Sequence, residues 1–158
     1  MRAMTTSNDQ TLALLHALLR IGRDSVEGYT RAERDLPDRN LAAEFEGYRR
    51  QREKIVADLE NRIRELRGDP DARPTAAGAL HRAWMDLRSI TAAHPNETVL
   101  VEMERGEDFA VDAFRQALRE PEVDAATRAL LEHHYELVQA AHDRVKQWRD
   151  RSNLARPA

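Results

Sequence analysis

Apolar residues recur at intervals of three and four along most of this chain, which is the spacing of α-helices that bury one face. Pro37, Gly68 and Pro121 interrupt the pattern and mark positions where helices end or begin. No stretch carries the alternation of apolar and polar residues that is typical of a half-buried strand. We therefore predict an all-α protein whose four long helices cover about residues 8–35, 38–67, 97–119 and 122–151.

Capping residues predict where these helices end. Ser7 stands three residues before Gln10, which is the arrangement of a capping box, and predicts the start of the first helix. Asp38 is suited to cap the second helix, and Gly68 is suited to the position just after its last turn. Pro121 is suited to the first turn of the fourth helix, where a missing N–H costs nothing.

The connections indicate how the helices are arranged. Short links join the first helix to the second and the third to the fourth, so each pair should be antiparallel. The connection between the second and third helices is long, and residues 76–91 within it carry one apolar stripe that predicts a short extra helix. One long crossover is the connectivity of ferritin-like four-helix bundles, so we expect residues 1–158 to form a single domain of that class.

Polar residues interrupt the apolar stripes of three helices. Arg52 stands in the stripe of the second helix, Glu104 and Glu107 stand in that of the third, and His142 stands in that of the fourth. Arginine keeps its charge inside a protein and therefore requires an anion. Alternatively, the Arg52 side chain extends past the edge of the stripe into solvent. Since all four residues lie near the middle of their helices, we predict one buried network. In it, Arg52 bridges the two glutamates, and His142 completes the hydrogen bonds.

A metal site is the alternative for the same residues. Glu104, Glu107 and His142 offer the oxygen and imidazole ligands that iron or manganese would take. A ferritin-like di-metal site needs a Glu from each of two helices and Glu-x-x-His from each of the other two. The first helix offers only small residues at that level, and the Arg52 guanidinium would repel a neighbouring cation. We therefore favour the network, which needs no cofactor.

Composition narrows the possible functions. The chain has 158 residues, a net charge of -3 and no cysteine, which excludes disulfides, thiolate metal ligands and thiol nucleophiles. The arginines of the second helix are interspersed with glutamates, which favours a solvated, salt-bridged face over nucleic-acid binding. No apolar run could span a membrane and the first residues lack a signal-peptide core, so we expect a cytoplasmic protein. A nucleophile elbow and a phosphate-binding loop are also missing, so catalysis is not favoured.

Several short strings of residues carry a resemblance to a known family. They are Ala-Leu-His-Arg-Ala-Trp-Met-Asp-Leu at residues 79–87, Glu-Arg-Gly-Glu-Asp at residues 104–108, and Ala-His-Asp-Arg-Val at residues 141–145. Gly28-Tyr29 and Gly68-Asp69-Pro70 fit the same pattern. With these strings the chain resembles a family of bacterial four-helix-bundle proteins of unknown function, within the ferritin-like, rubrerythrin-related group.

The resemblance implies a ferritin-like fold, self-association and a link with the bacterial stress response. We therefore expect a dimeric, non-catalytic structural or binding protein, with an Arg/Glu/His network in place of a di-metal site. The alternative is a metal-binding protein or weak oxidase that uses Glu104, Glu107 and His142 with iron or manganese. Neither hypothesis involves a membrane or nucleic acid as partner, and the sequence leaves any small-molecule ligand open.

Overall fold

The computed structural model of this protein describes residues 2–72 and 95–155, and the side chains of residues 7–72 and 97–155. These residues form four α-helices, α1 (Arg2–Asp35), α2 (Arg39–Glu65), α4 (Pro95–Arg119) and α5 (Ala125–Leu154), and no strand lies among them. The predicted all-α class with four long helices is confirmed. The extra helix predicted at residues 76–91 lies outside the described residues. Across the described ranges, none of the helices offers an apolar stretch of membrane-spanning length.

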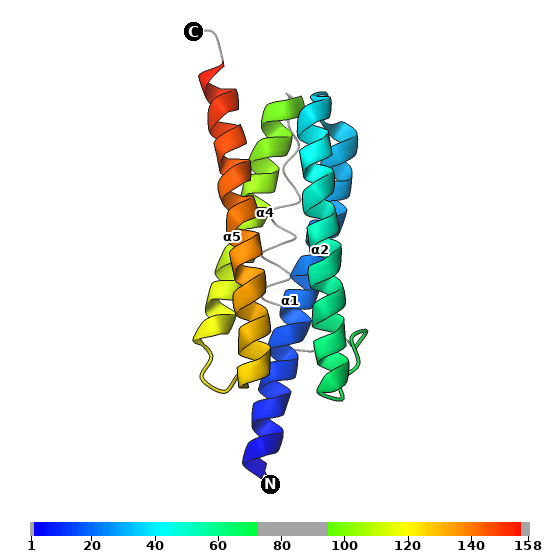
Figure 1. Ribbon diagram of the computed structural model, residues 1–158, viewed down its shortest axis with the longest axis vertical. Coiled ribbons are helices and arrows are strands. Elements are labelled where there is room, and N and C mark those ends of the chain that lie inside the picture. Colours follow the sequence, from blue (N-terminus) through cyan, green and yellow to red (C-terminus); the bar gives the residue numbers. More distant parts are fainter. Residues whose placement is uncertain (1, 73–94, 156–158) are drawn as a thin grey trace.

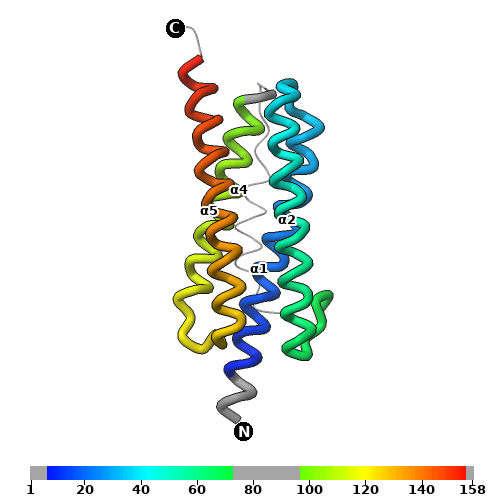
Figure 2. Tube along the Cα trace, in the orientation of Figure 1, coloured from blue at the N-terminus to red at the C-terminus, as the bar shows by residue number. Residues whose placement is uncertain are grey.

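The four helices lie side by side along the long axis of the molecule (Figures 1 and 2). α1 packs most extensively on α2, and α4 on α5, because the short links at residues 36–38 and 120–124 turn each pair back on itself. α1 also packs on α4, whereas α2 and α5 make few direct contacts. α2 ends at the end of the bundle opposite to where α4 begins (Figure 1), so these two helices run parallel and their connection is a long crossover.

The apolar stripes of the four helices meet in two buried clusters, and each cluster draws residues from every helix. Burying one such leucine or phenylalanine side chain contributes roughly 1.5–3 kcal/mol, so the clusters supply the main driving force for packing. The first cluster includes Leu15, Ile55, Phe114 and Leu131, and the second includes Tyr29, Phe45, Leu100 and Val145.

Two of the predicted helix starts are wrong, because the hydrogen bonds of Ser7 and Asp124 differ from those that the sequence suggested. α1 begins at Arg2, earlier than expected, and the Ser7 hydroxyl donates to the carbonyl of Glu122 at 3.0 Å instead of capping the helix. α5 begins at Ala125, later than expected, because Asp124 caps it and accepts a hydrogen bond from the Thr127 amide at 3.0 Å.

The ends of α2 are better predicted. Asp38 caps its first turn, as expected, and accepts hydrogen bonds from the amides of Asn40 and Leu41. After its last turn the left-handed residue is Arg67, with φ of 63°, and not Gly68. The Gly68 amide then donates to the Ile63 carbonyl at 2.8 Å, which completes a Schellman-type end.

Gly68 is needed because α1 and α2 approach closely there. A Cβ at this position would lie 2.6 Å from Leu12 Cδ2 and 2.9 Å from Ile63 Cγ2, both closer than real contacts allow. Gly47, in contrast, is exposed in the middle of α2, and a Cβ there would meet nothing within 4 Å.

These two glycines predict opposite effects of the same substitution. Gly68→Ala should destabilise the protein by about 1–3 kcal/mol, because the extra methyl group must displace packed side chains. Gly47→Ala should stabilise it by about 0.5–1 kcal/mol, because alanine loses less backbone entropy in a helix. Urea unfolding measures both. Equal effects of the two substitutions would contradict the close approach at Gly68.

Candidate functional site

Arg52 and Glu107 form an ion pair in the middle of the bundle. Arg52 of α2 is only 1% exposed, and Glu107 of α4 is only 2% exposed. Nη2 of Arg52 donates a hydrogen bond to Oε2 of Glu107. The helical period of α2 places Arg52 on the same face as Phe45 and Ile55, so the backbone commits the guanidinium to the interior. Transfer of each charge out of water costs several kcal/mol, which only their mutual contact and further hydrogen bonds offset.

Tyr29 of α1 supplies the third member of this group. It is fully buried, and its hydroxyl donates to Oε1 of Glu107 at 2.7 Å. Burial, reinforced by the charge of Glu107, raises the pKa of Tyr29 well above its ordinary value, so the hydroxyl keeps its proton. The ring packs edge-on against Phe45, with 5.5 Å between ring centroids. Sequence reasoning missed this role, although a buried tyrosine that needs a partner for its hydroxyl was a usable signal.

Tyr29, Arg52 and Glu107, called the central polar group below, lie where the two apolar clusters meet. On α2, Arg52 stands between Phe45 of one cluster and Ile55 of the other. The Arg52 Cζ atom lies 5.9 Å from the centroid of the Tyr29 ring, within the range of a cation–π interaction. Nε of Arg52 is buried without a hydrogen-bond partner among the described residues, so the guanidinium is not fully satisfied.

Glu104 and His142 do not join the central polar group, which corrects the predicted network. Oε2 of Glu104 lies 3.0 Å from Nε of Arg149 on α5. Nε2 of His142 lies 2.6 Å from Oδ1 of Asp108, and its Nδ1 lies 3.0 Å from Oδ1 of Asp143. Burial opposes the charged imidazole, but the hydrogen bonds of Asp143 and Asp108 prevail and raise the pKa of His142. Each of the two residues has found a partner nearer the surface than Arg52.

The same separation bears on the metal hypothesis. Glu104, Glu107 and His142 each contact a different set of partners, and these sets do not meet. Among the side chains that the structure describes, no three histidines, aspartates or glutamates come close enough to share one ion. The described residues therefore do not assemble the ligand set that the sequence offered as an alternative.

Another buried polar residue, His134 of α5, lacks a hydrogen-bond partner among the described residues. It is 0% exposed, and neither ring nitrogen makes a hydrogen bond within the described part of the chain. Oδ2 of Asp58 on α2 lies 3.4 Å from Nε2, close enough for attraction but without hydrogen-bond geometry. Desolvation exceeds the attraction of Asp58 and lowers the pKa of His134 to about 4. The imidazole is therefore neutral at pH 7.

Several arginines of α2 pair with acidic residues, some on the same helix, as the spacing predicts, and some on other elements. Arg49 donates to Glu33 of α1 at 2.9 Å, and Arg50 donates to Glu46 one turn earlier on the same helix. Arg62 donates to Asp124 at 2.8 Å, beyond the end of α4. These carboxylates neutralise much of the positive charge on this part of α2.

Two solved structures share this architecture. A bacterioferritin from Desulfovibrio desulfuricans, solved with its diiron site in different catalytic states, has a TM-score of 0.79 and 16% identity, with 96% of this chain and 85% of that chain covered. A dodecameric thioferritin from Bacteroides fragilis, described as bacterioferritin-related, has a TM-score of 0.74 and 15% identity, with 93% of this chain and 89% of that chain covered. The fold is therefore that of a ferritin-like four-helix bundle.

The sequence itself assigns the family. Residues 1–120 match the model of a domain of unknown function, DUF2383, and the chain belongs to this family. The resemblance to an uncharacterised family with a ferritin-like fold is thereby confirmed. No curated protein sequence matches the chain.

The buried ion pair predicts a large and specific loss of stability. Glu107→Ala should lower the free energy of unfolding by about 3–5 kcal/mol, because it leaves the Arg52 charge buried and unpaired. The double variant Arg52→Met, Glu107→Leu should recover most of this loss, because it removes both charges and keeps the volume. Urea unfolding at pH 7 measures each change. As a control, Glu104→Ala should cost less than about 1 kcal/mol, because its partner Arg149 is partly exposed. Equal losses for Glu107→Ala and Glu104→Ala would contradict the assignment.

His134 predicts how stability changes in acid. Its folded-state pKa of about 4 lies below the ordinary value of 6.5, so the unfolded chain binds more protons between these limits. The protein should therefore lose about 3 kcal/mol through this group as the pH falls from 6.5 towards 4. His134→Leu should flatten the pH dependence of the unfolding free energy in this window. Identical pH profiles for His134→Leu and the unsubstituted protein would show that the imidazole is not buried.

Proposed function

We propose that this protein is a non-catalytic member of the ferritin-like fold that serves as a structural or binding bundle. The observation that carries the proposal is the buried pair of Arg52 and Glu107 at the centre of the helices. The guanidinium puts a permanent positive charge, fixed by α2, in the interior where related bundles can hold metal cations. Glu107 neutralises that charge, and both of its oxygens are already hydrogen-bonded.

The residues around this pair do not fit a diiron site such as the one named for the Desulfovibrio bacterioferritin. A divalent cation beside Glu107 would stand next to a guanidinium that cannot lose its proton, and the repulsion would weaken binding. The small residues of α1, Gly22 and Ser25, offer no carboxylate at this level. Glu104 and His142 are engaged by Arg149 and Asp108.

Self-association belongs to the same proposal. The Bacteroides thioferritin is described as dodecameric, which supports an oligomeric state for a bundle of this shape. The sequence expectation is a dimer. The link with stress response and the cytoplasmic location, which the sequence also suggested, stay predictions.

Metal content tests the proposal against its alternative. The full-length protein should bind much less than one iron or manganese per chain after incubation with Fe²⁺ or Mn²⁺ and desalting, as measured by plasma mass spectrometry. It should also fail to speed the aerobic oxidation of Fe²⁺. Glu104→Gln and His142→Ala, which leave the buried pair intact, should not change either result.

Stoichiometric metal that is lost in both Glu104→Gln and His142→Ala would overturn the proposal in favour of a metal-binding protein or weak oxidase. Stoichiometric metal that both variants retain would equally exclude the metal-free bundle and would place the ion elsewhere. Size-exclusion chromatography with light scattering on the same samples checks the dimer.

A further inference from the structure

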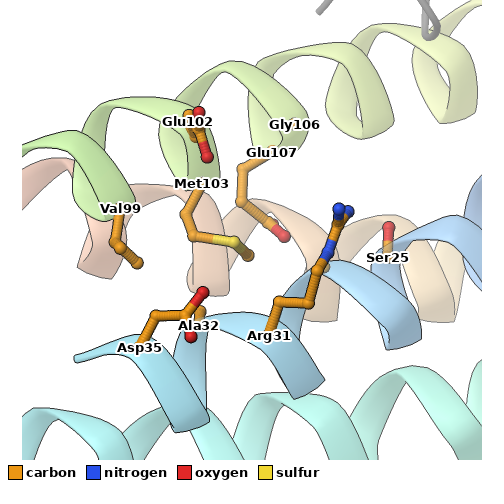
Figure 3. A pocket seen from close by; sticks show the side chains of 10 residues that line it. Ser25, Arg31, Ala32, Asp35, Val99, Glu102, Met103, Gly106 and Glu107 are labelled. Carbon is orange, nitrogen blue, oxygen red and sulfur yellow. The ribbon is translucent and has the colours of Figure 1, made fainter. Parts of the chain in front are cut away.

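A pocket of about 170 Å³ opens between α1 and α4, beside the central polar group (Figure 3). Small residues leave this space, since Ser25 and Gly28 of α1 face Gly106 of α4 across it. Gly22, further towards the start of α1, instead allows α1 to lie close to α2, because a Cβ there would lie 3.0 Å from Val56 Cγ2. A Cβ at Gly28 would meet only Met103 Sδ, at 3.9 Å. The small residues at the level of Gly28 therefore leave an open space between α1 and α4.

Some of the charged residues that line the pocket have ion-pair or hydrogen-bond partners, and others do not. Glu107 reaches it from the interior, where Arg52 and Tyr29 already bind both carboxylate oxygens. Arg31 and Glu102 also line it, and both residues are exposed. Neither makes an ion pair or hydrogen bond within the described part of the chain, although the Arg31 charge acts at longer range on Asp35, one turn later in α1. Most other charges on the same helices do have such partners, so these two are available to a ligand.

The two available charges come from opposite walls and lie towards opposite ends of the pocket. α1 and α4 are antiparallel, which places Asp35 of α1 near the first turns of α4, with Glu102. Side chains lean towards the N-terminus of their helix, so Arg31 leans towards Ser25 and away from Asp35. Figure 3 shows the Arg31 guanidinium on the Ser25 side, and Asp35 and Glu102 on the other.

Asp35 adds to the negative end. Its carboxylate accepts two hydrogen bonds from the neighbouring Arg34, at 2.7 and 3.2 Å, and these lower its pKa, with a smaller contribution from the charge of Arg31. It is therefore ionised at pH 7. Between the charged ends, the walls are apolar and formed by Ala32, Val99 and Met103.

We propose that this pocket binds a small zwitterion, of the kind of an α-amino acid with a medium-sized apolar side chain. The ligand carboxylate pairs with the Arg31 guanidinium, and its ammonium group pairs with Glu102 and the nearby Asp35. Its side chain lies against Met103 and Val99. A cavity of about 150 Å³ can hold a benzene molecule, so this pocket of about 170 Å³ has room for the apolar side chain of such an amino acid. The charged groups of the ligand would lie at its open edge, where Arg31, Asp35 and Glu102 are exposed. The inference goes beyond the proposed function and does not depend on it, since Arg31 and Glu102 take no part in the buried pair.

Three matched probes test the need for both charges. Isothermal titration of the full-length protein would use L-leucine, then 3-methylbutylamine, which lacks the carboxylate, and 4-methylpentanoate, which lacks the ammonium group. L-Valine and L-methionine extend the series in side-chain size. We expect at least one amino acid to bind and both single-charge analogues to bind roughly tenfold more weakly or worse, because each lacks a charge-assisted contact.

Variants of the pocket assign the contacts. Arg31→Gln and Glu102→Gln should each weaken amino-acid binding by roughly tenfold or more. Gly28→Leu should abolish it by filling the pocket, and this variant should fold because its Cβ meets only an ordinary contact. Arg105→Gln, on an exposed position of α4 outside the pocket, is the matched control and should bind like the unsubstituted protein.

The proposal fails if none of the three amino acids binds, if the amine binds as well as L-leucine, or if Arg31→Gln leaves the affinity unchanged. Each of these results is separate from the metal measurement. A metal-free protein that binds no amino acid would support the proposed function and contradict this site. A metal-loaded protein that binds an amino acid would contradict the proposed function and support this site.

Discussion

The structure of the bundle depends on the buried positive charge of Arg52, which cannot be lost by deprotonation. Arg52 lies on the buried face of α2, and its guanidinium stays protonated at any pH that the fold survives. Glu107 of α4 pairs with Arg52, and Tyr29 of α1 donates a hydrogen bond to Glu107. This group of contacts therefore links α1, α2 and α4. The two apolar clusters lie on either side of this contact. Replacing a buried ion pair by apolar residues of similar volume is often neutral or stabilising, whereas removing one partner is strongly destabilising, so the two charges depend on each other.

Polar contacts of the same kind join the two helix pairs elsewhere. Glu44 of α2 accepts hydrogen bonds from Arg144 at 2.6 Å and from the Trp148 indole at 2.8 Å, both on α5. Arg62 of α2 reaches Asp124 near the other end of the bundle. Because α2 and α5 have few direct backbone approaches, these long side chains bridge them. Charged side-chain contacts thus hold the α1–α2 pair against the α4–α5 pair, in addition to the burial of apolar residues.

The same fold therefore carries different interiors. In a ferritin-like bundle, the helices present mid-length side chains to a shared centre, and the identity of those side chains decides whether the centre suits a metal. Here the centre holds an arginine neutralised by a glutamate, and a pocket lies to one side of it, between α1 and α4. Structural similarity at 16% identity shows that the two proteins share a fold. The chemistry of this protein follows from the side chains that its own sequence places on that fold.

The sequence by itself determined the helices and their apolar faces, because helical periodicity is local and fixes which residues share a face. It also placed Arg52 in the apolar stripe of α2, where a buried guanidinium needs an anion. The tertiary structure decided that the Arg52 side chain is buried. Only the tertiary structure decided which anion that was. Glu104 and Glu107 share a stripe, but the rotation of α4 turns Glu107 to Arg52 and leaves Glu104 to Arg149. Helix rotation and axial shift depend on the packing of all the helices together, and no single stripe encodes them.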